Sequence, residues 1–342
     1  MRSIETAEPG AIRAIDIDRP VAGAHDIVVR IRACGICGSD VSYIAMGGVQ
    51  GADGAIAPTP LGHEPAGEIV EVGEAIHDLA VGDRVVINPM AAPSGVIGNG
   101  GALGAMRDYL LIENAVAGHS VAVIPDSLPF DVAALNEPIA VARHFVNRAN
   151  PQPGEKVIVF GAGPIGLGAT IWLKLRGVEH VVVADVLPER LERALAVGAD
   201  AVINSSREDV AARLTELHGE SANALGMPRP ATDIYMDAAG VGAVIDTTIA
   251  AAKWKARLVM AAFHKKPDLI DTAGMLMSEL TYIASMGYPT EIFEVTPELA
   301  AYWERFALLI SHRVPWEEAD HAYELALTPG AADKVVVVFD GD

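Results

Sequence analysis

The sequence predicts an α/β protein in which a mostly β domain precedes a doubly wound parallel sheet. The first third of the chain shows short strand patterns joined by turns. In the middle, short unbroken apolar runs alternate with helical patterns, as expected for strands buried between two layers of helices. A G-x-G-x-x-G motif at residues 161–166 links the first of these runs to a helix.

The β-rich first third is identified from alternating apolar and polar residues. Residues 27–32, 68–72 and 84–87 show the period of two that half-buried strands have, with glycines between them as turns. Residues 91–105 are rich in glycine and predict a loop. One helix is expected over residues 129–149, because an aspartate lies in its first turn and apolar residues follow at helical spacing.

Six apolar runs in the middle of the chain predict the strands of the parallel sheet. They occupy residues 157–160, 181–184, 201–203, 234–236, 258–262 and 280–284. Each run is apolar on both faces, which fits a strand covered by helices on either side. A valine-rich run at residues 335–339 predicts a last strand that can return to the β-rich domain.

Composition and charge restrict the partners and the location. At 342 residues the chain is long enough for two domains, and 51% hydrophobic residues can fill a sizeable core. Its net charge of −20 repels phosphate backbones and anionic membranes, so we expect no nucleic-acid or membrane partner. We find neither a secretory signal nor a run as long as a membrane helix, and the two cysteines make no disulfide framework. We therefore expect a cytoplasmic protein.

The glycine motif predicts a dinucleotide site. Gly161 suits a tight turn after the strand, Gly163 lets the backbone approach a pyrophosphate, and Gly166 allows close packing of helix on strand. Asp185 ends the next predicted strand, where a carboxylate binds the adenosine ribose hydroxyls and repels a 2′-phosphate, so NAD is favoured over NADP. The alternative is that Asp185 only caps a loop. The predicted cofactor site comprises Gly161, Gly163, Pro164, Ile165, Gly166, Asp185 and Arg190.

Four side chains form a donor set suited to zinc. Cys37, His63, Glu64 and Glu137 offer a thiolate, an imidazole and two carboxylates. The Cys34-x-x-Cys37 spacing also allows a redox pair or half of a four-cysteine zinc site. No second C-x-x-C occurs in the sequence, which excludes the four-cysteine site and leaves the redox pair open.

The residues around these donors resemble a known signature. The segments CGICGSD at residues 34–40 and GHEPAG at 62–67 are similar to the signature of zinc-dependent alcohol dehydrogenases in the medium-chain dehydrogenase/reductase family. The segment NEP at residues 136–138 resembles that of the family's polyol and butanediol dehydrogenase branch. The resemblance covers essentially the whole chain. It implies a GroES-like catalytic domain with the zinc site at residues 1–150, an NAD-binding Rossmann domain at 151–286, and a C-terminal segment at 287–342 that returns to the catalytic domain.

The resemblance also implies which residues bind the metal. Cys37 and His63 would ligate a catalytic zinc, and Glu64 would ligate it in some states and exchange with water or substrate. Glu137 stands where related branches have a third protein ligand. Cys34 would be a structural neighbour and not a ligand.

Further roles implied by the resemblance concern the chemistry. Ser39 would contact the substrate hydroxyl and start proton removal, while Asp40 would hold His63 in one tautomer. Zinc would act as a Lewis acid that lowers the pKa of the substrate hydroxyl, and the substrate would then pass a hydride to the nicotinamide.

Two departures from the family pattern change what we expect. Many members bind a structural zinc through four cysteines, whereas the corresponding residues 88–109 contain none, so one zinc per chain is implied. Some members place a histidine five residues after the cysteine ligand as a proton relay. This chain has Ser42 there, which cannot titrate near neutrality, so the relay is expected to use ribose hydroxyls and water.

The favoured function is an NAD-linked dehydrogenase that interconverts secondary alcohols or polyols with their ketones. An L-threonine dehydrogenase is the nearest alternative enzyme, but the sequence shows no anchor for an amino-acid carboxylate. A non-catalytic NAD(P)H-binding relative is the alternative from another class, and such proteins usually lack the zinc ligands.

Expectations for the substrate pocket come from position near the motifs, and those for the oligomeric state come from the resemblance. Pocket candidates near the motifs are Tyr43, Met46, Met106 and Tyr288, each of which can equally be plain core packing. The family forms dimers and tetramers, so we expect a homodimer or homotetramer, with residues 280–284 as a possible edge strand at the interface.

Overall fold

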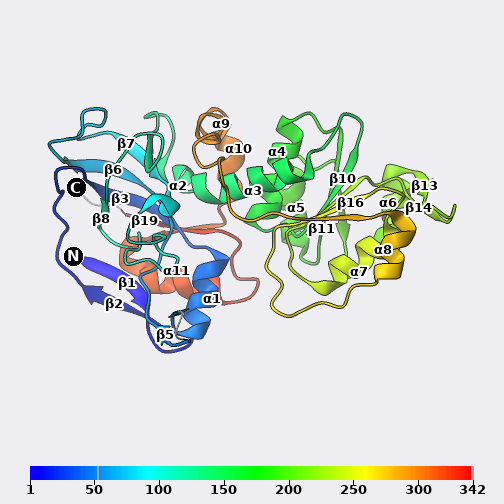
Figure 1. The fold of residues 1–342 in the computed structure, drawn as a ribbon, viewed down its shortest axis with the longest axis horizontal. Helices are drawn as coiled ribbons and strands as arrows, with labels where there is room; N and C mark the ends of the chain where they lie inside the picture. The colour runs from blue at the N-terminus through cyan, green and yellow to red at the C-terminus, as the bar shows by residue number, and fades with distance from the viewer. Residues whose placement is uncertain (52–53, 340–342) are drawn as a thin grey trace. The chain divides into compact units, whose positions relative to one another are not determined.

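The computed structural model describes residues 1–51 and 54–339 and divides the chain into two compact units. The first unit comprises Met1–Glu137 and Ile292–Asp342, and the second comprises Pro138–Glu291. The prediction of an α/β fold is confirmed, because a mainly antiparallel sheet forms the first unit and a parallel sheet forms the second. Figure 1 shows the ribbon of both units and labels many of their elements.

A seven-stranded sheet is the framework of the first unit. Its strands are β3 (Ile27–Gly35), β6 (Glu64–Val72), β7 (Arg84–Ile87), β8 (Tyr109–Ile112), β9 (Val121–Val123), β18 (His312–Pro315) and β19 (Val335–Val338). The order is β18-β19-β3-β6-β7-β9, with β8 also paired to β3. The C-terminal strand β19 runs antiparallel to β3 (Figure 1), so residues from both ends of the chain meet in one sheet.

Smaller elements complete the first unit. They are β1 (Arg2–Thr6), β2 (Ile12–Asp16), α1 (Gly38–Met46), β4 (Val49–Gln50), β5 (Ile56–Ala57), η1 (Pro89–Ala91), α2 (Phe130–Ala133), α9 (Thr296–Ala301), α10 (Trp303–Ala307), η2 (Trp316–Glu318) and α11 (Ala319–Leu327). The core includes fully buried side chains from β3 and from α11, such as Ile27, Val29 and Tyr323. Burying these apolar side chains fixes the ends of β3 and β6, where the predicted metal ligands lie.

The second unit is a six-stranded parallel sheet with helices between its strands. Its elements after α3 (Asn136–Ala149) are β10 (Lys156–Phe160), α4 (Pro164–Leu175), β11 (His180–Asp185), α5 (Pro188–Ala196), β12 (Ala201–Asn204), α6 (Val210–His218), β13 (Glu220–Ala222), β14 (Pro228–Pro230), β15 (Ile234–Asp237), α7 (Gly242–Ala251), β16 (Arg257–Met260), α8 (Thr272–Ser278) and β17 (Thr281–Ala284). The strand order is β12-β11-β10-β15-β16-β17, and every pair in it is parallel. The chain adds β11 and β12 on one side of β10 and then crosses to its other side to add β15, β16 and β17. A ligand-binding crevice is expected where the two halves meet, at the carboxyl end of β10.

The six predicted strands are confirmed, and burial explains why they could be predicted from sequence. Val157, Ile158 and Val159 of β10 are all fully buried, so both faces of the strand are covered. The prediction for β16 extended too far, since the strand ends at Met260, which pairs with Asp237 at the end of the neighbouring strand. Within the described part of the chain, no helix combines the length and the apolar composition needed to cross a membrane.

The single helix predicted over residues 129–149 is wrong, because the structure has two helices there. The short α2 ends at Ala133, and α3 begins at Asn136. Pro138 explains the break, since a proline has no N–H to donate to the carbonyl of Ala134 and its ring would clash with that group. Pro138 is tolerated in the first turn of α3, where an N–H lacks a helical partner in any case.

Candidate metal centre and dinucleotide site

Cys37, Ser39 and Asp40 lie where β3 gives way to α1. The strand ends at Gly35, and Cys37 is the residue that precedes the first turn of the helix. The Cys37 backbone N–H donates a hydrogen bond to the Asp40 carboxylate at 2.9 Å. This local bond fixes the turn that carries the half-buried Cys37.

His63 and Glu64 reach the same turn through strand pairing. Glu64 begins β6 and pairs with Gly35 of β3, while His63 directly precedes the strand. The ligand atoms of Cys37, His63 and Glu64 lie within 4.8 Å of one another. Across residues 1–51 and 54–339, this is the one group of three or more cysteine, histidine and acidic side chains with such spacing.

The chemistry of these three groups fits a divalent metal ion. His63 and Glu64 are 3% and 1% exposed, and Glu64 Oε1 has no hydrogen-bond partner among the described residues. A buried carboxylate oxygen without a partner is costly, and a cation in contact with it would remove that cost. Thiolate, imidazole and carboxylate are the ligands that zinc takes in proteins.

Ser39 and Asp40 flank the two nitrogens of the His63 ring. Asp40 Oδ1 lies 3.6 Å from Nδ1, and the Ser39 hydroxyl lies 3.5 Å from Nε2. Burial lowers the pKa of His63, but the negative charges of Asp40 and Cys37 outweigh it and raise that pKa well above its usual value. Asp40 lies beside Nδ1 and Ser39 beside Nε2, so the two residues face different sides of the ring.

Lys334 is a buried residue of this site that no sequence motif predicts. It precedes β19, is 2% exposed, and donates hydrogen bonds to the Glu64 carboxylate and, at 3.1 Å, to the Ile36 carbonyl oxygen. Burial would lower the pKa of Lys334, but the charges of Glu64 and Cys37 and the bond to Glu64 raise it. No local motif marks this lysine, because only the pairing of β19 with β3 brings it to the site.

The structure does not bring Glu137 into the cluster of three donors. Glu137 is half-buried in the first turn of α3, and its negative charge acts on Lys334. Cys34 is fully buried in the core, where burial raises the pKa of its thiol and the thiol faces the Gly35 carbonyl at 3.6 Å. A neutral, enclosed thiol favours a packing role for Cys34.

The four pocket candidates lie in different surroundings. Tyr43 is half-buried on α1 and its hydroxyl donates a hydrogen bond to the side-chain oxygen of Asn99. Met46 ends the same helix and is 43% exposed. Met106 is fully buried in the core of the first unit, which favours a packing role. Tyr288 is buried in the second unit.

The glycine motif in the second unit has the geometry of a phosphate-binding turn. Gly161 follows β10 with φ +93°, a left-handed conformation that favours glycine. A Cβ on Gly166 would overlap the Gly161 carbonyl oxygen, so the helix can pack on the turn only with glycine there. Gly163 caps α4, and Pro164, which has no N–H, begins its first turn. The backbone N–H of Ile165 has no partner within the helix and can face a phosphate.

Asp185 ends β11 beside this turn and is 7% exposed. Its carboxylate accepts backbone hydrogen bonds from Ala162 at 2.7 Å, Val186 at 2.7 Å and Leu187 at 3.0 Å. The Arg190 guanidinium lies 3.9 Å from the same carboxylate. Asp185 thus ties the glycine turn to the end of the neighbouring strand, and Arg190 stands next to it.

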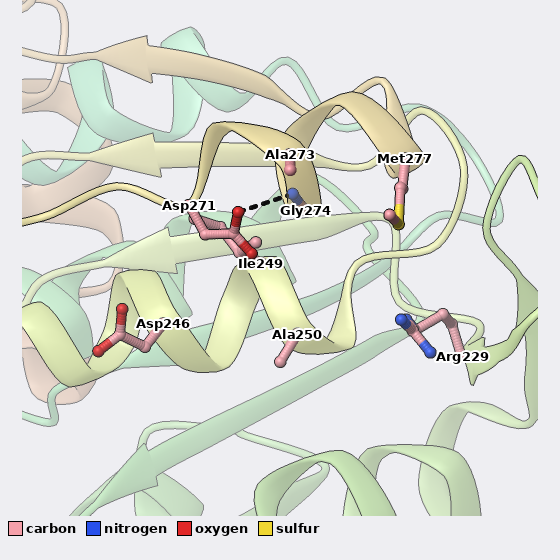
Figure 2. A pocket seen from close by; sticks show the side chains of 8 residues that line it. All are labelled: Arg229, Asp246, Ile249, Ala250, Asp271, Ala273, Gly274 and Met277. Carbon is pink, nitrogen blue, oxygen red and sulfur yellow. Dashed lines mark hydrogen bonds between the residues drawn. The ribbon is translucent and has the colours of Figure 1, made fainter.

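Two cavities lie within the second unit. One, of about 570 Å³, opens at the carboxyl ends of β16 and β17, where Asp237 bonds to His264 at 2.8 Å. The other, of about 370 Å³, lies between α7, α8 and β14 (Figure 2). Of its two acids, Asp246 and Asp271, the second accepts a hydrogen bond from the backbone N–H of Gly274, as Figure 2 shows. None of the predicted site residues lines this cavity.

Comparison with known proteins identifies both parts of the chain. Residues 23–125 match the alcohol dehydrogenase GroES-like domain, and residues 164–301 match the zinc-binding dehydrogenase domain. The (R,R)-butanediol dehydrogenase of Bacillus subtilis is 29% identical over 81% of this chain and 82% of its own length. Its crystal structure superposes with a TM-score of 0.85 at 25% identity, covering 98% of this chain and 99% of the other.

Two further relatives extend the comparison. Sorbitol dehydrogenase of Bombyx mori is 29% identical over 95% of both chains. An alcohol dehydrogenase from Escherichia coli CFT073, solved in complex with NADH, superposes with a TM-score of 0.82 at 27% identity and covers 99% of each chain.

Proposed function

The chain belongs to the zinc-dependent medium-chain alcohol dehydrogenase family, and we propose that it oxidises secondary alcohols or polyols reversibly with NAD as hydride acceptor. Its cofactors are zinc and a nicotinamide dinucleotide. The butanediol and sorbitol dehydrogenases among its relatives support a substrate with more than one hydroxyl group.

The observation that carries this proposal is the buried group of Cys37, His63 and Glu64. These residues would hold the zinc, and Glu137 would approach it from α3 as a further ligand or through water. When bound, zinc would act as a Lewis acid toward the oxygen of an alcohol or ketone.

The surrounding side chains orient the donors and move the proton. We assign to the Ser39 hydroxyl, 3.5 Å from His63 Nε2, the first step of proton removal from the substrate hydroxyl. Asp40 faces the other ring nitrogen and fixes the orientation of His63. Lys334 occupies Glu64 Oε2 and leaves Oε1 for the metal. Beyond Ser39, the proton would pass through ribose hydroxyls and water, because the exposed Ser42 cannot titrate near neutrality.

In the second unit, the glycine turn and the N-terminus of α4 would bind the pyrophosphate. Asp185 would bind the adenosine ribose hydroxyls, with Arg190 beside it. Its negative charge supports NAD over NADP, because a 2′-phosphate placed there would meet a buried carboxylate.

A panel of alcohols and ketones tests the proposed function. Purified enzyme should reduce NAD+ with secondary alcohols or vicinal diols, followed by NADH absorbance, and a zinc chelator should abolish the reaction. Turnover that survives complete removal of zinc would contradict the metal assignment. Reaction with L-threonine alone would instead assign the chain to the amino-acid branch.

We also propose that the enzyme is a cytoplasmic homodimer or homotetramer. Strand β17 lies at the edge of the parallel sheet, and Tyr282 on it is 37% exposed. Met286 and Phe263 nearby are 69% and 79% exposed, and covering such apolar side chains favours association. Cys34 and Cys37 form no disulfide, which also suits a reducing compartment. Light scattering during size-exclusion chromatography would show more than one chain per particle, and a single chain would refute the interface.

A further inference from the structure

The cysteine-free stretch at residues 92–106, here called the glycine loop, packs its backbone against the segment that leads to His63. The backbone N–H of Ala105 donates to the Gly62 carbonyl at 2.8 Å, and that of Met106 donates to the Leu61 carbonyl at 2.9 Å. The loop is closed on itself by a bond from the Gly98 N–H to the Leu103 carbonyl at 2.6 Å. Main-chain bonds of this kind fix the loop and the segment relative to each other.

Two glycines make this close contact possible. Gly98 and Gly104 are both buried, and a Cβ on Gly98 would overlap the Gly62 carbonyl oxygen and lie 2.9 Å from the His63 backbone nitrogen. A Cβ on Gly104 would lie 2.8 Å from the Leu61 backbone nitrogen. Atoms of real side chains do not approach backbone so closely, so a larger residue at either position must displace residues 61–63 or the loop.

The other side of the same segment is held by the turn that carries Cys37. The Gly62 N–H donates to Asp40 Oδ1 at 3.5 Å, and a Cβ on Gly62 would lie between the loop and strand β3, 2.6 Å from the Met106 backbone nitrogen and 3.0 Å from Cys34 Sγ. Residues 61–63 are therefore enclosed between the Asp40 turn and the glycine loop. A shift of the loop would therefore be passed to the backbone of residues 61–63, which carries His63.

We propose that the glycine loop is the positioning element of the metal centre, and that Gly98 and Gly104 set the distance between His63 and Cys37. This inference rests on the proposed zinc site. Gly98 and Gly104 contact neither substrate nor metal in it and act through the backbone of residues 61–63.

Three glycine-to-alanine variants separate two effects: overlap of the new Cβ with residues 61–63, and strain from a positive φ at the substituted residue. Gly98→Ala introduces both, because Gly98 has φ +63° and a Cβ there overlaps Gly62. Gly104→Ala introduces overlap at a residue without positive φ. Gly100→Ala is the matched control in the same loop, since Gly100 has φ +92° but is exposed, and its nearest neighbour would be a Val49 methyl at 3.4 Å.

The readouts are the zinc dissociation constant, measured by competition with a chromophoric chelator, and the absorption spectrum of the cobalt-substituted protein. Gly98→Ala and Gly104→Ala should weaken zinc binding by about 10-fold or more and alter the cobalt spectrum. Gly100→Ala should keep the wild-type zinc affinity and spectrum, although strain lowers its stability to urea. A purely structural loop would lower stability in all three variants and leave the affinity and spectrum of the folded protein unchanged.

The outcomes distinguish this inference from the proposed function. If wild-type protein binds no zinc, both fall. If wild-type protein binds zinc and all three variants bind it equally well, only the positioning role of the loop is refuted. If Gly98→Ala does not fold, Gly104→Ala decides, because its backbone conformation is open to alanine.

Discussion

Replacing Lys334 by methionine tests the buried ion pair at the metal centre. Methionine keeps the apolar stem of the side chain but removes the ammonium group that bonds to Glu64. Both side chains are almost fully buried, so solvent and salt screen their interaction weakly. Removing one partner of such a pair leaves a buried charge uncompensated, which costs about 3–5 kcal/mol. We expect the zinc-free variant to lose this much of its free energy of unfolding.

Urea unfolding of the zinc-free protein, followed by circular dichroism, measures this effect. The double variant Lys334→Met with Glu64→Gln should recover most of the loss, because neither charge then remains. Zinc should stabilise Lys334→Met more than it stabilises the wild type, since the metal takes over the charge of Glu64. If the two substitutions are additive, so that their coupling energy is near zero, the reasoning from the buried pair is refuted.

Four other predictions follow from the same geometry. Cys37→Ser should lose zinc and turnover whereas Cys34→Ser keeps most of both, and equal losses would favour a shared C-x-x-C site. Asp185→Gly should lower kcat/KM with NAD+ and raise it with NADP+, and a wild-type enzyme that prefers NADP+ would contradict the ribose assignment. Glu137→Gln should lower zinc affinity or kcat by about 10- to 100-fold, and wild-type values of both would remove Glu137 from the site. Burial lowers the pKa of His218 from 6.5 to about 4, so unfolded chains take up a proton below pH 6.5 that folded protein does not. The contribution of His218 to the free energy of unfolding should therefore be full above pH 6.5 and fall by up to about 3 kcal/mol toward pH 4. His218→Asn should flatten that decline in urea titrations. An unchanged pH profile would show that the buried His218 does not produce it.

The strands of the parallel sheet could be predicted from sequence because burial on both faces leaves an unbroken apolar run. Residues 157–160 show this, with every side chain of the run buried in β10. The first and last residues of each strand and helix were harder to predict, because they depend on neighbouring elements and on single residues such as proline. Strand β16 stops where its partner β15 stops at Asp237, and Pro138 divides a region that is helical by composition alone.

The metal donors could be proposed from sequence because they lie in short local motifs. The buried lysine that bonds to one of the donors comes from a distant part of the chain. Cys37 and Asp40 are three residues apart, and the bond between them belongs to one turn. Lys334 contributes to the site only because β19 pairs with β3, and no motif in its own neighbourhood indicates a buried cation. Such residues come from tertiary packing, which sequence periodicity does not encode.

A similar limit applies to Asn99. The glycine-rich composition of its loop predicted irregular structure, but not the bond from Tyr43 to Asn99. Contacts of this kind depend on how a loop folds back onto a helix, so residue type and spacing alone do not reveal them.

The central claim is that one zinc ion occupies the group of Cys37, His63 and Glu64 in each chain. Elemental analysis of the purified, desalted protein measures it most directly. The structure predicts one tightly bound zinc per chain, since one such donor group exists among the described residues and residues 88–109 contain no cysteine. Protein purified in the presence of zinc that retains none, or that retains two tightly bound ions per chain, would contradict the account.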